Sequence, residues 1–517
     1  MIKAGIIKPM RVATALAYCP FNFDLMYIKF GIQESLDLRL KIVRKKTPAT
    51  SKANCPTFIL FLSALFIFLP AHSYGQDSSK YHLDAYMQAA FKTGFNGNVL
   101  VAKKGRIIYQ QAFGFRNFDT KIPLDNQSVF TMCSVSKQFT ATAIMLLKEA
   151  HKLTLNDTLR QYFPELPYQH ITIANMLDHT SGLPEYQLLM VHNWDHSKIA
   201  NNADLVKMVA AKTPPVFFKP GTKYRYSNTA YVLLASIIEK VSGQSYQDFI
   251  AGHIFKPLGM RSSAIYAQPN DHPAGGIADY ADGFMYSDSL KKYVPAVNVY
   301  QLVRYLAGIY GDAGVSTTTG DLLKWDRSVT HDALLTKKDQ EDMLAPRTLI
   351  DTAGKLYYGY GVKTGKNELG SFIMHEGIWP GYRTCLTRYV EPDITIIVFS
   401  NNESNAIGIS RALGFIASGR EVVLPYLHKE IKLQPEELSR YTGTYLSPAP
   451  VELITRGGKF YRHREGTPDI ELKPESPTKF FYADASDRQV EFVVVNDKVV
   501  KAYLISNGVR SELVRQN

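Results

Sequence analysis

The feature that most constrains the fold is a set of strand-like segments at both ends of a long helical stretch. Strands are expected where apolar residues alternate or run together, at 98–102, 106–109, 371–375, 382–389 and 394–399. Helical spacing of apolar residues occurs at 80–93, 136–150, 203–212 and 229–241. Because strands from both ends of a domain must meet in one sheet, we predict an α+β fold. It comprises an antiparallel sheet flanked by helices, with an all-helical subdomain.

The pattern of apolar and polar residues changes from about residue 434. Short strand-like runs separated by polar turns recur at 451–455, 459–463, 479–482, 490–495, 498–505 and 509–514. This spacing is typical of a small antiparallel barrel or sandwich. We therefore predict a small all-β, barrel-like C-terminal domain over residues 434–517.

The N-terminal segment has the order of a secretory signal. Residues 1–52 hold ten Lys or Arg and three acidic residues, and an uncharged apolar run follows at 58–69. Small residues precede Gln76, so we predict a leader over 1–75 with cleavage after Gly75 and a secreted or periplasmic product. The run is shorter than the roughly 20 residues of a membrane-spanning helix, so an uncleaved anchor is the less favoured alternative. No stable membrane span is expected after cleavage.

The charge distribution argues against a nucleic-acid-binding protein. The chain has a formal net charge of +12, but much of the basic excess lies in the leader, and no basic stripe is interleaved with aromatic residues. We therefore expect no nucleic-acid partner.

Only Cys133 and Cys385 follow the predicted cut, which is too few for a disulfide framework. A single bridge between them stays open.

The first chemical motif is Ser134-Val135-Ser136-Lys137. The pattern S-x-x-K also occurs at Ser289 and Ser476, but those copies lie in polar segments, whereas Ser134 precedes an apolar helical stretch. Residues i and i+3 share one face of a helix, so Lys137 is expected beside the Ser134 hydroxyl. A serine hydroxyl is a weak nucleophile until a neighbouring base takes its proton.

Two further motifs follow along the chain. Tyr226-Ser227-Asn228 comes after a Pro-Gly turn and before a helix, which places Tyr226 and Asn228 on a loop. His375-Glu376-Gly377 ends a predicted strand. The zinc pattern H-E-x-x-H fails there because Trp379 stands where the second histidine is required, so no metal is expected.

Taken together, the three motifs resemble those of the serine β-lactamase and penicillin-binding family, which includes class C β-lactamases, DD-peptidases and esterases. The likeness extends to the segments around Ser134 and to 177–184, 254–260, 311–317 and 358–361. It implies a hydrolase domain over residues 77–425 that needs no cofactor. Lys363-Thr364-Gly365 spells the lysine form of the third motif, but it comes too early, so we assign that role to the histidine form at 375–377.

The resemblance also implies roles for individual residues. Ser134 would attack an ester or amide carbonyl, and Lys137 and Tyr226 would share the proton transfers. Substrate binding is assigned to Asn228, His375, Gly377 and Ile378. The backbone N–H groups of Ser134 and Ile378 would form the oxyanion hole. An unperturbed His375 would titrate near neutral pH and make activity pH-sensitive.

Two departures from the family pattern stand out. Cys133 occupies a place where the family often has glycine, and Glu376 replaces a small or hydroxyl residue. The second departure weakens the expected carboxylate-binding part of that strand. His179 is expected to be structural rather than part of a catalytic triad.

Several functions remain open. DD-peptidase, D-aminopeptidase, carboxylesterase and β-lactamase activities share the fold and the motifs. The expected partner is a small-molecule or peptide substrate, with cell-wall peptides among the candidates. The alternative class is a non-catalytic penicillin- or peptidoglycan-binding module with the same fold.

Overall fold

The computed structural model describes residues 74–516, with gaps at 267–278, 330, 332, 353–354, 448, 466 and 485. The basic segment and apolar run of the predicted leader lie outside the described residues. The predicted cleavage point after Gly75 falls within the first described helix, α3 (Tyr74–Lys92). In the part of the chain that the structure describes, no helix has the length and apolar character needed to cross a membrane.

The central element is an eight-stranded antiparallel sheet with the order β10-β11-β12-β13-β14-β15-β1-β2. Its strands are β1 (Gly97–Lys103), β2 (Arg106–Phe113), β10 (Thr348–Asp351), β11 (Leu356–Tyr358), β12 (Lys363–Asn367), β13 (Gly370–Trp379), β14 (Tyr382–Tyr389) and β15 (Ile394–Ser400). The N-terminal β1 pairs with the C-terminal β15, with Val99 opposite Val398. The two ends of the domain therefore meet in one sheet, and the predicted fold class is confirmed.

Strands β1, β14 and β15 in the middle of this sheet are buried on both faces, which explains the apolar runs within them. All seven residues of β15 are buried. Because side chains alternate along a strand, Ile397 and Phe399 enter the core beneath the helical part, whereas Ile396 and Val398 enter a second core. The second core also contains residues of α3 and of α15 (Ala406–Ala417).

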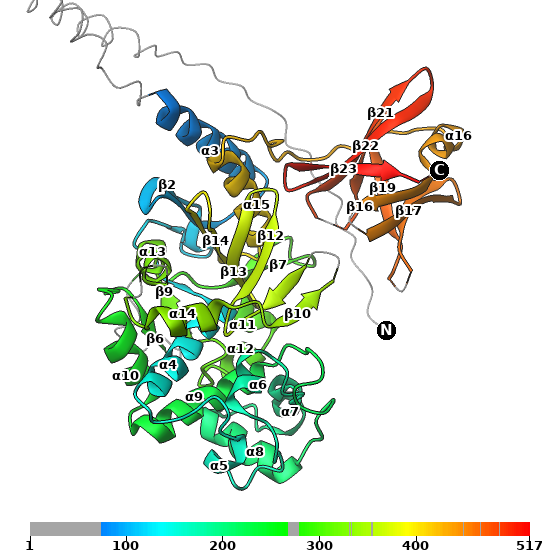
Figure 1. The fold of residues 1–517 in the computed structure, drawn as a ribbon. Helices are drawn as coiled ribbons and strands as arrows, with labels where there is room; N and C mark the ends of the chain where they lie inside the picture. Colours follow the sequence, from blue (N-terminus) through cyan, green and yellow to red (C-terminus); the bar gives the residue numbers. More distant parts are fainter. Residues whose placement is uncertain are drawn as a thin grey trace, which may run out of the picture. The chain divides into compact units, whose positions relative to one another are not determined.

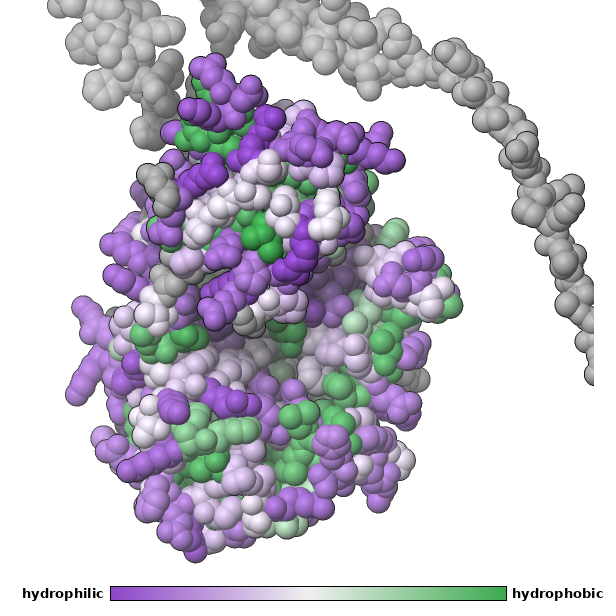
Figure 2. Space-filling model, turned by 90° about the vertical axis from the view of Figure 1, so that its right-hand side faces the viewer, coloured by the Kyte–Doolittle hydropathy of each residue, from purple (hydrophilic) through white to green (hydrophobic). Residues whose placement is uncertain are grey.

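The inserted part is mainly helical, as predicted, with the short strands β3 to β9 between its helices (Figure 1). Its helices are α4 (Lys137–Glu149), α5 (Leu159–Tyr162), α6 (Ile173–Leu177), α7 (Tyr186–Asn193), α8 (Asn202–Lys212), α9 (Asn228–Ser242) and α10 (Tyr246–Ile250). The shorter α11 (Ala296–Val299) and α12 (Leu302–Tyr305) precede α13 (Thr319–Ser328) and α14 (Lys337–Leu344). On the face in Figure 2, apolar patches are interspersed with polar surface over this helical part.

The C-terminal segment forms a closed eight-stranded barrel. Its strands are β16 (Gly443–Ser447), β17 (Ala449–Arg456), β18 (Lys459–His463), β19 (Ile470–Ser476), β20 (Lys479–Tyr482), β21 (Arg488–Val495), β22 (Lys498–Ser506) and β23 (Val509–Arg515). The short helix α16 (Pro435–Leu438) precedes them. Strands β16 and β19 were not predicted from the sequence. β19 contains Pro474 beside an irregular register, and proline is unusual inside a strand.

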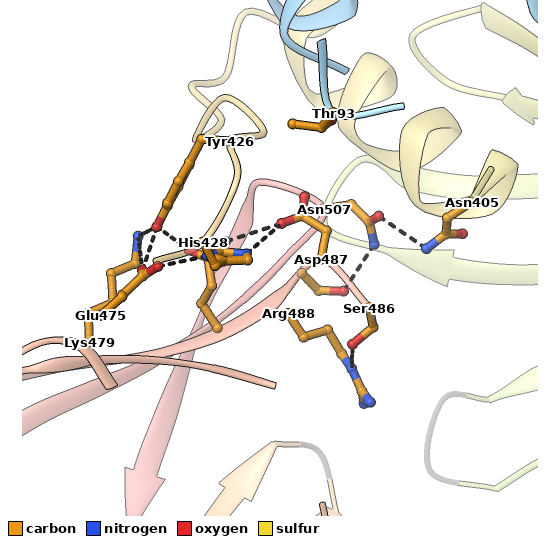
Figure 3. Close-up of polar contacts among 12 residues, drawn as sticks. Thr93, Asn405, Tyr426, His428, Glu475, Lys479, Ser486, Asp487, Arg488 and Asn507 are labelled. Atoms are coloured by element: carbon orange, nitrogen blue, oxygen red, sulfur yellow. Dashed lines mark hydrogen bonds and ion pairs between the residues drawn. The ribbon is translucent and has the colours of Figure 1, made fainter. Parts of the chain in front are cut away.

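The barrel contacts the sheet domain through the turn between β22 and β23. Val509 is buried in the same core as α3 and α15. The Tyr86 hydroxyl donates to the Asn507 carbonyl oxygen at 3.2 Å. Asn405 Nδ2 donates to Asn507 Oδ1 at 3.1 Å (Figure 3). The barrel therefore contributes Val509 to the second core of the sheet domain.

The segment between α15 and the barrel is anchored by a histidine. His428 Nδ1 lies 2.7 Å from Glu475 Oε2, and its Nε2 lies 3.7 Å from Asp487 Oδ1 (Figure 3). The imidazole also stacks on Phe481, with ring centroids 4.8 Å apart. These contacts hold the connecting segment against strands β19 to β21.

Candidate active site

The candidate nucleophile, Ser134, lies in a tight turn that leads into α4. The turn is a 3₁₀ helix, η1 (Cys133–Ser136). Cys133 has a φ of +50°, a left-handed conformation that glycine adopts without strain, which accounts for the glycine common there in the family. Ser136 Oγ accepts a hydrogen bond from the Val315 N–H at 3.1 Å and so fixes the turn.

Lys137 lies beside this serine, as the spacing predicted, and is fully buried. Its Nζ donates to Ser134 Oγ at 3.1 Å, Asn228 Oδ1 at 2.9 Å and the Asp312 carbonyl oxygen at 2.8 Å. An ammonium group has three protons, so these three bonds use all of them. Burial lowers the pKa of Lys137 to about 8, although Asp312 and Glu185 act to raise it. The neutral amine, with a free lone pair, is therefore accessible close to physiological pH.

Tyr226 packs against the same lysine. The Lys137 Nζ lies 4.9 Å from the centroid of the Tyr226 ring. Burial raises the pKa of the Tyr226 hydroxyl well above its usual range, and a hydrogen bond with Ser134 only partly opposes this shift. Of the two groups expected to share the proton transfers, Lys137 thus has the lowered pKa, whereas burial favours the protonated form of Tyr226.

Asn228 is the first residue of α9 rather than part of a loop, because Ser227 caps the helix. The side-chain amide is held from both ends. Its Oδ1 accepts from Lys137, while its Nδ2 donates to Glu185 Oε2 at 3.2 Å, and its backbone N–H donates to Glu185 Oε1 at 3.1 Å. Glu185 was missed by the sequence analysis, because an isolated acidic residue has no pattern that points to a site.

His179 is buried behind the Tyr226 loop and fixes it. Its Nδ1 accepts the Ser227 N–H at 3.1 Å, so the other nitrogen carries the proton of the neutral ring. The imidazole packs on Tyr226, with centroids 4.3 Å apart, and on Tyr358 at 4.4 Å. Burial lowers the pKa of His179 well below its usual value, and the charge of Lys137 adds to the shift. These contacts agree with the structural role expected for His179.

His375 does not have the environment that the sequence suggested. Its Nδ1 lies 2.6 Å from the carbonyl oxygen of Glu376, and its Nε2 lies 2.8 Å from the Tyr358 hydroxyl. A carbonyl oxygen only accepts, so Nδ1 carries the proton and Nε2 accepts from Tyr358. Burial lowers the pKa of His375 to about 4, although the charge of Glu376 opposes the shift. The ring is therefore neutral near pH 7, and titration near neutral pH, which was expected only for an unperturbed His375, does not apply.

Gly377 lets strand β13 approach the turn that holds the serine. A Cβ added at this residue would lie 2.3 Å from the Met132 carbonyl oxygen and 2.8 Å from Cys133 Cβ. Because only glycine permits this approach, the end of β13 lies directly against η1. The Ile378 side chain, which follows, is 58% exposed at this edge.

Lys363 belongs to β12, one strand away from the assigned third motif. It lies opposite Met374 in the register of β12 and β13, and its ammonium forms an ion pair with Glu376. Burial acts to raise the pKa of Glu376, but His375, which is charged only at acidic pH, and the ammonium of Lys363 outweigh it, so the net pKa is lowered. The lysine of the early K-T-G sequence thus neutralises the unusual acidic residue of the third motif.

The three motifs therefore converge from three elements: η1 with α4, the N-terminus of α9, and β13. Cys133 and Cys385 are both buried and free, so the bridge between them that the sequence left open is absent. Supporting groups that the sequence analysis did not assign to the site are Glu185, Asp312, Tyr358 and Lys363. Asp312 and Tyr358 lie within segments that resemble the family, and Lys363 lies in the Lys-Thr-Gly sequence. Those patterns were the only features of the sequence that pointed to these three residues.

Comparisons with known proteins identify the family to which this sequence is similar. The sequence profile described as Beta-lactamase matches residues 83–413. The chain is 36% identical over 446 residues to penicillin-binding protein 4* of Bacillus subtilis, covering 83% of this chain and 98% of that protein. It is 26% identical to a D-aminopeptidase of Gluconobacter oxydans, covering 72% and 67% of the two chains. The crystal structure of a penicillin-binding protein from Bacillus halodurans superposes with a TM-score of 0.57 at 26% identity, covering 64% of this chain and 98% of that one.

Proposed function

Since this chain belongs to the Beta-lactamase family, we propose that it is a serine hydrolase that cleaves an ester or amide through an acyl-enzyme on Ser134. The observation that carries the proposal is the 3.1 Å contact between Lys137 Nζ and Ser134 Oγ, together with the lowered pKa of Lys137. A base within hydrogen-bonding reach of the nucleophile is the geometry that acyl transfer requires.

The reaction follows from these contacts. Neutral Lys137 takes the proton of the Ser134 hydroxyl while Oγ forms a bond to the carbonyl carbon. The bond from that carbon to the leaving oxygen or nitrogen then breaks, and the leaving group takes a proton through Tyr226 and Lys137. Water completes the cycle by the same proton path and releases the acid. The backbone N–H groups of Ser134 and Ile378 stabilise the oxyanion, each contributing about 3 kcal/mol.

Asn228 and His375 have supporting roles in this mechanism. Asn228 holds Lys137 through its Oδ1, and its Nδ2, which also bonds Glu185, is the group we assign to the acyl part of the substrate. Neutral His375, bonded to Tyr358, packs behind Tyr226, with ring centroids 6.3 Å apart. We propose peptides or amides as substrates because the similar proteins include D-aminopeptidases and penicillin-binding proteins.

Covalent labelling tests this function. The purified chain is incubated with a fluorescent fluorophosphonate or a fluorescent penicillin, and the labelled peptide is identified by mass spectrometry. We expect the adduct on Ser134 and its loss in Lys137→Ala. An adduct on Ser289, Ser316 or Ser476 would contradict the assignment. Labelling without turnover of esters, D-alanyl peptides or cephalosporins would favour a non-catalytic binding module.

We further propose that the protein is exported and cleaved near Gly75, on the basis of the basic flank and the apolar run at 58–69. N-terminal sequencing of the protein recovered from the periplasm or medium tests this. A cytoplasmic form that begins near Met1 would contradict it, and a membrane-bound form that retains 58–69 would favour an anchor.

A further inference from the structure

Glu185 immediately precedes α7 and lies against the N-terminus of α9, and the mechanism described so far gives it no role. The backbone on both sides of it is held by α9. Thr229 Oγ1 donates to the Pro184 carbonyl oxygen at 2.6 Å and accepts the Tyr186 N–H at 2.8 Å. The Glu185 carboxylate therefore extends from a fixed point of the chain toward Asn228.

Both oxygens of this carboxylate accept hydrogen bonds from Asn228. Oε1 accepts the backbone N–H at 3.1 Å, and Oε2 accepts Nδ2 at 3.2 Å. A carboxylate has no proton to donate, so the Nδ2 end of the Asn228 amide must face it. Burial raises the pKa of Glu185, while these hydrogen bonds and the charge of Lys137 act to lower it. The free N–H groups at the N-terminus of α9 also favour a negative charge at this place.

The other end of the same amide faces Lys137. Asn228 Oδ1 accepts from Lys137 Nζ at 2.9 Å. The donor end of the amide thus meets an anion and its acceptor end meets a cation. A reversed amide would turn its N–H groups toward the lysine and its oxygen toward Glu185, and both contacts would be unfavourable. Glu185 therefore decides which atom of Asn228 the lysine meets.

This orientation determines where the lone pair of neutral Lys137 points. The three neighbours of Nζ are Ser134 Oγ, Asn228 Oδ1 and the Asp312 carbonyl oxygen. A neutral amine has two N–H groups and one lone pair, and the amide and carbonyl oxygens can only accept. They take the two N–H groups, so the lone pair is left for the Ser134 hydroxyl. With the Asn228 amide reversed, Nδ2 would compete with that hydroxyl for the lone pair.

We propose that Glu185 is a positioning residue that acts through Asn228, fixing the amide so that the lone pair of Lys137 is directed at Ser134. The same contact leaves the second Nδ2 proton for the acyl part of the substrate. The inference rests on the proposed function, because it takes Lys137 as the base that activates Ser134.

Glu185→Gln tests this role because it removes the charge and keeps the size of the side chain. An amide has one oxygen, so one of the two contacts with Asn228 becomes donor to donor, and the Asn228 side chain can relieve it only by reversing. We expect the limiting rate at high pH to fall by about tenfold or more. Glu185 also acts to raise the pKa of Lys137, so the midpoint of the pH dependence should fall by about one pH unit.

The readout is the second-order rate at which a neutral fluorophosphonate labels Ser134, measured on both sides of the Lys137 pKa of about 8. In this reaction Ser134 Oγ forms a bond to phosphorus, the P–F bond breaks, and fluoride leaves while Lys137 takes the serine proton. Each pH profile gives a limiting rate and a midpoint. Denaturant unfolding of every variant shows whether it is folded.

Two further variants separate positioning from a structural role. Thr229→Ala removes the bonds that hold the backbone around Glu185 but removes no charge, so its midpoint should stay at the wild-type value even if its rate falls. Asn228→Ala removes the residue through which Glu185 acts. In that background Glu185→Gln should change the limiting rate by less than about twofold, because residues that act together are not additive.

An unchanged limiting rate in Glu185→Gln, or an equal loss with and without Asn228, would overturn the positioning role while the hydrolase function stands. So would a midpoint that Thr229→Ala moves as far as Glu185→Gln does. If Glu185→Gln does not fold, Glu185→Asp replaces it. That variant withdraws the carboxylate by one methylene, and its loss of rate should likewise disappear without Asn228. If the wild-type protein is not labelled at Ser134, the proposed function fails and the positioning role fails with it.

Discussion

Replacing Gly377 by alanine tests whether the approach of β13 to the serine turn sets the active geometry. The added Cβ would lie 2.3 Å from both the Met132 carbonyl oxygen and Thr384 Oγ1, and 2.8 Å from Cys133 Cβ. Non-bonded heavy atoms prefer separations of about 3.5 Å, so the strand and the turn must separate by about 1 Å. Thr384 Oγ1 also donates to the Met132 oxygen at 2.8 Å, so the same bond would be displaced.

The expected cost has two parts. Overpacking of this kind lowers the free energy of unfolding by about 1–3 kcal/mol. A displacement of about 1 Å at the oxyanion donors reduces kcat/KM by about a hundredfold. The assays are turnover of a p-nitrophenyl ester, the rate of fluorophosphonate labelling at Ser134, and denaturant unfolding followed by fluorescence.

Gly252→Ala is the matched control. A Cβ at Gly252 meets no heavy atom within 4 Å, and the residue does not have a positive φ. This variant should keep wild-type activity and stability. If Gly377→Ala keeps kcat/KM within about twofold of wild type, the close approach of β13 does not position the catalytic groups, and the reasoning from its contacts fails.

Three further predictions follow from individual groups. Since burial lowers the pKa of Lys137 to about 8 and the neutral amine is the base, kcat/KM for a neutral ester should rise with pH and level off above that value. A profile that is flat across this range would contradict the assignment. The pKa of His375 is about 4 when folded and about 6.5 when unfolded, so the unfolded state binds more protons between these values. The free energy of unfolding should therefore rise by about 3 kcal/mol from pH 4 to pH 6.5, and His375→Gln should remove this dependence in urea titrations. Truncation after Leu433 removes Val509 from the core around α3 and α15, so the shortened chain should unfold at a lower temperature in calorimetry. An unchanged midpoint would mean that the barrel is an independent module.

Local patterns in the sequence were sufficient for the main architecture. The alternation at 382–389 and the apolar run at 394–399 correspond to β14 and β15, and the helical spacing at 229–241 corresponds to α9. Such patterns succeed because each strand or helix buries its own apolar face. The contact of Lys137 with Ser134 was also predictable, since residues three apart on one turn are neighbours.

Other features depend on contacts between residues that are distant in the sequence, and only the tertiary structure decided them. Nothing near Lys363 in the sequence indicated that it would pair with Glu376 on the neighbouring strand. The sequence alone suggested that His375 would titrate near neutral pH, but burial beside Tyr358 keeps it neutral. Burial also lowers the pKa of Lys137 to about 8, so the neutral amine is accessible near physiological pH. A pKa depends on the solvent and charges around a group, and those are created only when distant segments pack together.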